Sequence, residues 1–138
     1  MTDPTTPATA EDRRRRRAPT ALFTLAERHA GTEAARTRAA GSATLLPHEA
    51  VRLVELLAAG TARRADREPR VDRDDLLAAL TLLPQVRAEL DETELGLLVM
   101  ARGRGLTWAQ VAEGLGLGSA QAAQQRHDRL ATRLQDDG

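Results

Sequence analysis

The stretch LTWAQVAEGLGLGSAQAAQQRHDRLATRL, residues 106–134, decides the expected fold. Thr107 and Gln110 have the spacing of a capping box, which predicts that a helix begins directly after Thr107. Residues 115–118 alternate leucine with glycine, a pattern typical of a tight turn. Ser119 can cap a second helix that continues to the end of the stretch. We therefore expect a short helix, a turn and a longer helix.

The longer helix is predicted to have one apolar side and one polar side. At about 100° per residue, a narrow stripe forms, and we expect it to be buried. The stripe consists of Ala123, His127, Leu130 and Leu134. Amide side chains lie on or beside the opposite side, at Gln121, Gln124 and Gln125. The helix should therefore present amides to solvent while its leucines face the core.

This distribution is typical of a helix that enters the major groove of DNA. Glutamine amides can pair bidentately with adenine, so the three amides are predicted base contacts. Guanidiniums, hydroxyls and the N–H groups of helix N-termini suit phosphates, which fix register without reading sequence. The predicted phosphate contacts are Arg102, Arg104, Thr107, Ser119, Arg126, Arg129 and Arg133. Asp128, which lies beside the amides, argues against deep insertion at that point because phosphates would repel it.

Three short runs of residues in this stretch also resemble a known family. They are Thr107-Trp108-Ala109-Gln110-Val111-Ala112, Leu115-Gly116 and Ser119-Ala120-Gln121-Ala122-Ala123-Gln124-Gln125-Arg126. They look like a helix-turn-helix common in actinobacterial DNA-binding proteins, similar to region four of sigma factors and more loosely to Myb-type repeats. The resemblance implies a trihelical DNA-binding unit over residues 91–134. Two positions depart from it: relatives often have an arginine at the position of Ala120 and an aromatic residue at that of His127.

Composition favours an all-α protein. The chain has 138 residues, of which 41% are hydrophobic, and its formal net charge is zero. Its aromatic residues are Phe23 and Trp108 alone, while alanine, leucine and valine supply most apolar side chains. Strands favour β-branched and aromatic residues, so this composition favours closely packed helices. We expect a small helical bundle with a C-terminal trihelical helix-turn-helix and a disordered basic N-terminal arm.

Residues 1–20 are the predicted disordered arm, because their Thr, Pro and Ala cannot form a core. The arm carries five consecutive arginines, Arg13, Arg14, Arg15, Arg16 and Arg17. Their like charges repel one another and stay solvated unless a polyanion is present. We expect them to form a non-specific DNA contact that can enter the minor groove. The alternative is a solvated tail that reflects codon usage, since all 20 basic residues of the chain are arginine.

Residues 21–90 are predicted to be helical. Pro47 suits the first turn of a helix that continues to about Arg64, and its apolar stripe is broad enough for a homodimer contact. A homodimer would read two half-sites and add specific surface. The alternative is that the stripe packs against the next helix of the same chain, capped by Asp72. The three helices expected in this region span about 21–40, 47–64 and 72–83. Pro84 is expected to end the third, or to start a short turn that continues to Leu90.

Asp91 and Glu94 also have capping-box spacing, which predicts that a new helix begins there. This helix would be the first of the trihelical unit, residues 91–134. The last residues, 135–138, are predicted to be a tail.

Several functions are not expected. The chain has no cysteine, which excludes disulfides and thiolate sites. His29, His48 and His127 have no partners at metal-ligand spacing, so no metal site is predicted. No nucleophile–base pair and no phosphate-binding glycine loop is found, so we expect no cofactor, no catalytic residue and no enzyme activity. No apolar run is long enough to span a membrane and no secretory signal is recognised, which favours a cytoplasmic protein.

Two functions fit these observations. The first is a protein that binds double-stranded DNA, either a transcriptional regulator or a nucleoid-associated factor. The second is a helical adaptor that contacts RNA polymerase or a sigma factor. The net charge of zero favours the adaptor, because dedicated DNA-binding domains are often basic.

Overall fold

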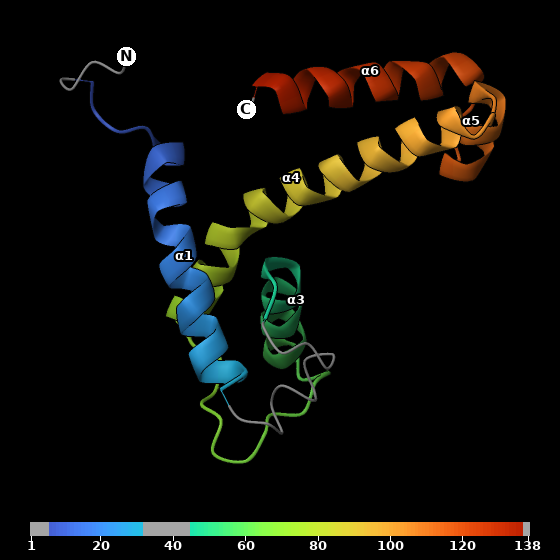
Figure 1. Ribbon diagram of the computed structural model, residues 1–138. Helices are drawn as coiled ribbons and strands as arrows, with labels where there is room; N and C mark the ends of the chain where they lie inside the picture. The colour runs from blue at the N-terminus through green and yellow to red at the C-terminus, as the bar shows by residue number, and fades with distance from the viewer. Residues whose placement is uncertain (1–5, 32–44, 137–138) are drawn as a thin grey trace. The chain divides into compact units, whose positions relative to one another are not determined.

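The computed structural model describes residues 6–31 and 45–136. Every regular element in these ranges is an α-helix, which confirms the all-α prediction (Figure 1). No helix in these ranges has both the length and the apolar character that crossing a membrane requires. The chain divides into two units, Met1–Val86 and Arg87–Gly138. The helices are α1 (Ala10–His29), α3 (Pro47–Ala58), α4 (Arg73–Gly103), α5 (Trp108–Leu115) and α6 (Ala120–Asp136).

The five consecutive arginines lie inside α1, so the prediction of a disordered arm is wrong for residues 10–20. Thr9 begins this helix with a capping box. Its Oγ1 accepts a hydrogen bond from the Asp12 backbone N–H at 3.0 Å, and the Asp12 carboxylate accepts one from the Thr9 N–H at 3.0 Å. Such a cap stabilises a helix by about 1 kcal/mol. Residues 6–9 precede the helix and contain no regular element, and residues 1–5 lie outside the described residues.

The apolar side of α1 holds it to the first unit. Ala18, Ala21 and Leu25 are buried, at the spacing of one helix face. Pro19 sits in the same helix and removes one backbone hydrogen bond. The burial of Ala18 before Pro19, and of Ala21 and Leu25 after it, outweighs the loss of this hydrogen bond, so the helix continues to His29. The later part of the helix predicted over 21–40, residues 32–40, lies outside the described residues.

The core of the first unit contains side chains from α1, α3 and the beginning of α4. The stripe of α3 contributes Ala50 and Val54 to this core, so the stripe packs within its own chain. The helix ends earlier than expected, at Ala58, because Gly60 adopts a left-handed φ of 78° and the Thr61 N–H bonds back to the Leu56 carbonyl at 3.0 Å. The buried members of the core are Ala18, Ala21, Leu25, Ala30, Leu45, Ala50, Val54, Ala79 and Leu82.

α4 is one continuous helix, so two sequence-based expectations are wrong. Pro84 does not end a helix, although it removes one backbone hydrogen bond. The carbonyl that Pro84 leaves without a backbone donor belongs to Leu80, an exposed residue. Asp91 and Glu94 do not begin a helix either, since both lie in the middle of α4. Buried Leu82 and Leu98 anchor α4 in the cores of the two units.

The second unit has a core of its own, built from the later part of α4, α5 and α6. Its buried residues are Leu98, Val111, Ala112, Ala123 and Leu130. Leu95, Ala101, Trp108 and Leu117 are partly buried and pack against them. The small Ala112 and Ala123 allow α5 and α6 to approach each other closely.

Candidate nucleic-acid interface

The helix α5 begins where the sequence predicts, and it ends at Leu115, the first residue of the predicted turn. The Thr107 Oγ1 accepts a hydrogen bond from the Gln110 N–H at 3.1 Å, and the Gln110 Oε1 accepts one from the Thr107 N–H at 2.8 Å. Gly116 follows with a left-handed φ of 70°, a conformation that side chains rarely adopt. The Leu117 N–H then bonds to the Ala112 carbonyl at 2.8 Å and turns the chain toward α6.

The orientation of α6 also matches the predicted stripe. The Ser119 Oγ caps the helix by accepting a hydrogen bond from the Ala122 N–H at 3.1 Å. Ala123 and Leu130 are buried, while His127 and Leu134 are partly buried. The leucines of α6 therefore face the core of the second unit.

The three amides predicted to read bases are all exposed, at Gln121, Gln124 and Gln125. No hydrogen bond is recorded between their side chains and any part of the chain that the structure describes. At about 100° per residue, Gln121 and Gln125 lie on the side opposite Ala123, and Arg129 follows Gln125 by one turn. This polar face is open to a ligand. Its contact with bases stays a prediction.

Two of the predicted phosphate contacts are instead held by acidic residues of α4. Arg126 Nε and Nη2 donate to the two carboxylate oxygens of Glu94 at 2.7 and 2.8 Å. Arg133 Nη1 donates to Asp91 Oδ2 at 2.9 Å. The hydrogen bonds that Arg126 donates to Glu94 raise the pKa of Arg126 above its usual value. Asp91 and Glu94, taken from the sequence as a capping box, thus serve to fasten α6 onto α4.

The other predicted phosphate contacts differ in what they bind. Arg102 lies 4.8 Å from the centre of the Trp108 ring and donates to the Leu106 carbonyl at 2.7 Å. Arg104 and Arg129 are exposed, and neither has an ion pair with any described residue. The hydroxyls of Thr107 and Ser119 are used as helix caps. Among the predicted phosphate contacts, Arg104 and Arg129 are therefore the arginines whose guanidiniums have no recorded partner in the described chain.

Trp108 links three parts of the second unit. The rings of Trp108 and His127 are 5.5 Å apart between centroids and tilted by 60°, while Arg102 covers the Trp108 ring. The His127 Nδ1 lies 3.0 Å from the Asp128 carboxylate. His127 therefore packs against an aromatic ring.

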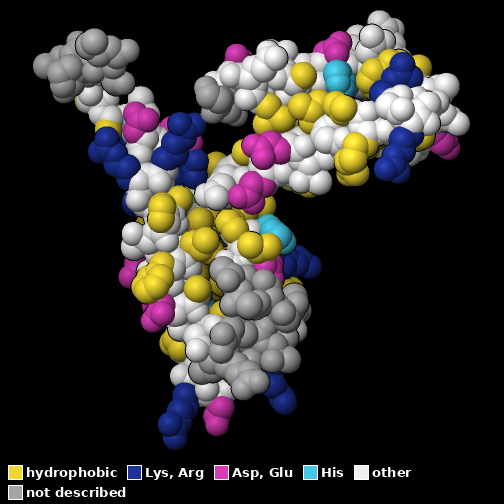
Figure 2. Space-filling model, in the orientation of Figure 1, with side chains coloured by type: hydrophobic (Ala, Val, Ile, Leu, Met, Phe, Trp, Pro, Cys, Tyr) yellow, Lys and Arg dark blue, Asp and Glu magenta, His cyan; other side chains and the backbone are white. Residues whose placement is uncertain are grey.

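The arginine run forms a basic surface on the N-terminal half of α1, where Figure 2 shows arginines gathered. Arg14 and Arg15 bond to Glu11 at 2.6 and 3.1 Å, and Arg14 also donates to the Thr81 carbonyl at 3.1 Å. The hydrogen bond from Arg14 lowers the pKa of Glu11 to about 2. Arg13 donates to the Ala8 carbonyl, and the structure records no ion pair for Arg16 or Arg17 among the described residues.

A buried polar network in the first unit has no counterpart in the sequence-based predictions. Arg28 Nε and Nη2 donate to the two oxygens of Asp75 at 2.7 and 3.0 Å, and His29 Nε2 lies 3.1 Å from the same carboxylate. Glu68 lies on the other side of the ring, 3.8 Å from Nδ1. The only sequence signal for this network is the acidic pair at the start of α4, which capping explains equally well. Among the described residues, no group of three acidic, histidine or cysteine side chains has a metal-binding arrangement.

Comparison with protein-family models, curated proteins and solved structures finds no significant match for this chain.

Proposed function

We propose that the second unit binds double-stranded DNA as a helix-turn-helix, with α6 in the major groove, in a transcriptional regulator or a nucleoid-associated factor. The observation that carries this proposal is the exposed polar face of α6. Gln121 and Gln125 lie on the side of α6 opposite the buried Ala123, and their amides form no recorded hydrogen bond with any described residue. A capping box at Thr107 and a left-handed turn at Gly116 define the helix and turn that precede that face.

The charges of the unit assign different roles to its arginines. Arg129 lies one turn after Gln125 and is exposed, so we assign it to a phosphate beside the bases that Gln121, Gln124 and Gln125 read. Arg102 and Arg104, at the end of α4, are assigned to the backbone as well. Arg126 and Arg133 are paired with acidic residues, so we assign them chiefly to holding α6 in place.

The basic surface of α1 is proposed as a non-specific contact. A helix of this length cannot follow the narrow minor groove as an extended arm would, so Arg16 and Arg17 are assigned to phosphates instead. They are the members of the run for which the structure records neither an ion pair nor a hydrogen bond to a described residue.

The test is fluorescence anisotropy of a labelled random-sequence duplex, titrated with the full chain at a series of salt concentrations. If Arg102, Arg104 and Arg129 each displace one counterion, the slope of log affinity against log salt is about −2.7, and steeper if α1 contributes. Arg129→Gln should reduce the magnitude of the slope by about 0.9. Binding that does not change with salt would contradict the proposal.

Two controls sharpen this test. Arg52→Gln removes the same charge from an exposed position on α3, where Arg52 pairs with Glu55, and should leave the slope unchanged. The double variant Arg16→Gln, Arg17→Gln measures the contribution of α1 to DNA binding without deleting the helix. Removing residues 1–20 is unsuitable, because Ala18 is part of the buried core. A genome-wide occupancy map then separates a regulator of few sites from a broadly bound nucleoid factor.

A helical adaptor for RNA polymerase or a sigma factor is the second candidate. It is favoured by large apolar side chains exposed on α4 in the second unit, namely Leu90, Leu97 and Met100, which are 66, 58 and 53% exposed. Apolar surface of this kind suits a protein partner better than a phosphate backbone. Absence of any shift of random duplex at low salt, together with co-purification with RNA polymerase that Leu97→Ser abolishes, would favour the adaptor. The same apolar surface is where a homodimer would form, and light scattering of the full chain tests that state.

A further inference from the structure

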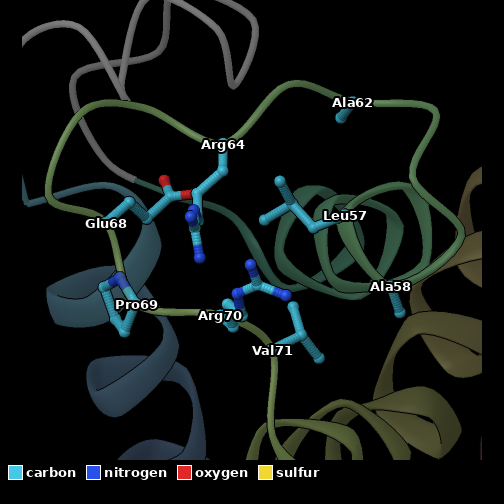
Figure 3. Close-up of a pocket in the computed structure, with 8 residues that line it drawn as sticks. All are labelled: Leu57, Ala58, Ala62, Arg64, Glu68, Pro69, Arg70 and Val71. Carbon is cyan, nitrogen blue, oxygen red and sulfur yellow. The ribbon is translucent and has the colours of Figure 1, made fainter.

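A cavity of about 390 Å³ opens beside the loop that connects α3 to α4. It belongs entirely to the first unit, and the end of α3 and the loop itself form its walls (Figure 3). Its size falls within the range of about 300–1,000 Å³ that is common for small-molecule sites. The lining combines the apolar Leu57, Pro69 and Val71 with the guanidiniums of Arg64 and Arg70.

The two guanidiniums point into the same space. Figure 3 shows Arg64 reaching in from one side of the loop and Arg70 from the other. Neither forms an ion pair with any described residue. Two like charges that share one cavity repel each other, and an anion placed between them turns that repulsion into two charge-assisted hydrogen bonds.

Glu68, the acidic residue in the wall of the cavity, is not the anion that pairs with Arg64 and Arg70. Glu68 is buried, with its side chain 3% exposed, and its carboxylate lies 3.8 Å from His29 Nδ1. Its carboxylate is therefore already engaged beside His29 in the interior of the unit. The part of the cavity that is open to a ligand is basic at Arg64 and Arg70 and apolar at Leu57 and Val71.

The loop is held in a defined and partly unfavourable shape. Arg67 adopts a positive φ of 63°, which a residue with a side chain rarely does. The Arg70 carbonyl is fixed by a hydrogen bond from Arg28 Nη2 at 3.1 Å, and the Glu68 N–H bonds to the Ala65 carbonyl at 3.1 Å. These bonds hold the backbone of Arg70 beside the cavity before any ligand arrives, which reduces the cost of ordering the site on binding.

We propose that this cavity binds a small organic oxyanion. A carboxylate or phosphate head lies between Arg64 and Arg70, and a short apolar body lies against Leu57 and Val71. The proposal is independent of DNA binding, because every residue that it uses belongs to the first unit.

The test is isothermal titration calorimetry of the full chain with four probes: benzoate, phenyl phosphate, the neutral benzyl alcohol and inorganic phosphate. We expect one saturable site for at least one of the two aromatic anions, with a Kd of roughly 1 mM or tighter. Benzyl alcohol should bind at least about 10-fold more weakly, since it leaves both guanidiniums unpaired. Inorganic phosphate should also bind more weakly than phenyl phosphate, because it makes no contact with the apolar wall. The anion that binds more tightly identifies the head group.

Variants connect the binding to these residues. Arg64→Gln and Arg70→Gln should each weaken the binding of the aromatic anions by about 10-fold. Arg52→Gln, an equal charge change on α3 outside the cavity, should have no effect on that binding. Circular dichroism melts establish that each variant is folded. Leu57→Ala should weaken the binding of phenyl phosphate and leave the binding of inorganic phosphate unchanged. No saturable binding of either aromatic anion, or equal binding by wild type, Arg64→Gln and Arg70→Gln, would overturn the proposal.

Discussion

Arg126 of α6 forms two parallel hydrogen bonds with Glu94 of α4, at 2.7 and 2.8 Å. The pair joins two helices whose residues are far apart in the sequence. Two turns further along α6, Arg133 donates a single hydrogen bond to Asp91 at 2.9 Å. Arginine and carboxylate in this bidentate geometry fix orientation as well as distance. The pairs therefore set how α6 is rotated about its axis, and thus which of its side chains face outward.

The first prediction concerns this pair. Glu94→Gln and Arg126→Gln should each lower the free energy of unfolding by about 0.5–1 kcal/mol, a modest cost because Arg126 is 42% exposed and solvent screens the pair. The double variant should cost less than the sum of the two, since either single change already breaks the interaction. Urea unfolding followed by the fluorescence of Trp108, the only tryptophan of the chain, measures the free energy of unfolding of wild type, the two single variants and the double variant. Strictly additive effects would show that the pair contributes nothing.

These contacts also mark the limit of what the sequence predicts. The region from α5 to α6 was predictable because its local signals agree: the capping box of Thr107 with Gln110, the glycine at the turn, Ser119 as a cap, and an apolar stripe in register with all of them. Asp91 and Glu94 show the same capping spacing, yet their side chains bind arginines of α6 instead. A partner about 30 to 40 residues away decides between the two roles, and spacing along the chain does not contain that information.

The remaining differences have similar causes. The cap formed by Thr9 and Asp12 is a local signal that the sequence contains, but the Thr-, Pro- and Ala-rich composition of the segment suggested that it could not form a core. Pro84 was expected to end a helix because propensity alone costs about 3 kcal/mol, and burial of Leu82 and Leu98 in two cores outweighs that penalty. The network of Arg28, His29 and Asp75 depends entirely on tertiary contacts and has no specific sequence signature.

The second prediction concerns base recognition by α6. Once a preferred duplex has been selected from a random library, Gln125→Ala should reduce discrimination at one base pair by about 1–3 kcal/mol, with little loss on random duplex. Gln135→Ala is the matched control, because Gln135 is an exposed amide near the far end of the same helix. Competition binding with single-base variants of the duplex provides the measurement. Equal losses for both variants at every position would remove Gln125 as a base contact.

The third prediction concerns Asp75 and pH. Burial by itself would raise the pKa of Asp75, but hydrogen bonds from Arg28, from the Asp72 backbone and from His29 outweigh it and hold the pKa below its usual value. A carboxylate with a lowered pKa stabilises the fold above the unfolded-state value of about 3.9, and this contribution is lost as the pH falls through the lower folded-state pKa. Asp75→Asn should therefore cost roughly 2–3 kcal/mol at neutral pH, because a buried charged partner is removed.

Urea unfolding at several pH values tests whether the stabilisation by Asp75 is lost on acidification. The difference between wild type and Asp75→Asn should be constant from about pH 7 to pH 5 and should narrow below about pH 4. Asp74→Asn, at an exposed neighbouring position, should change stability by less than about 0.5 kcal/mol at any pH. A difference between wild type and Asp75→Asn that widened on acidification would contradict the assigned role of the carboxylate.

The last prediction concerns Trp108, which packs between Arg102 and His127. Truncation of a fully buried tryptophan to alanine costs about 3–5 kcal/mol. The ring is only partly buried, so Trp108→Ala should cost less, about 2–3 kcal/mol. Trp108→Phe keeps an aromatic face for Arg102 and should recover more than half of that loss, whereas Trp108→Leu restores volume without the cation–π attraction, which contributes about 0.5–1 kcal/mol. Circular dichroism in urea follows all three variants. A Trp108→Leu protein as stable as Trp108→Phe would show that packing alone, without the guanidinium, holds the end of α4 against α5.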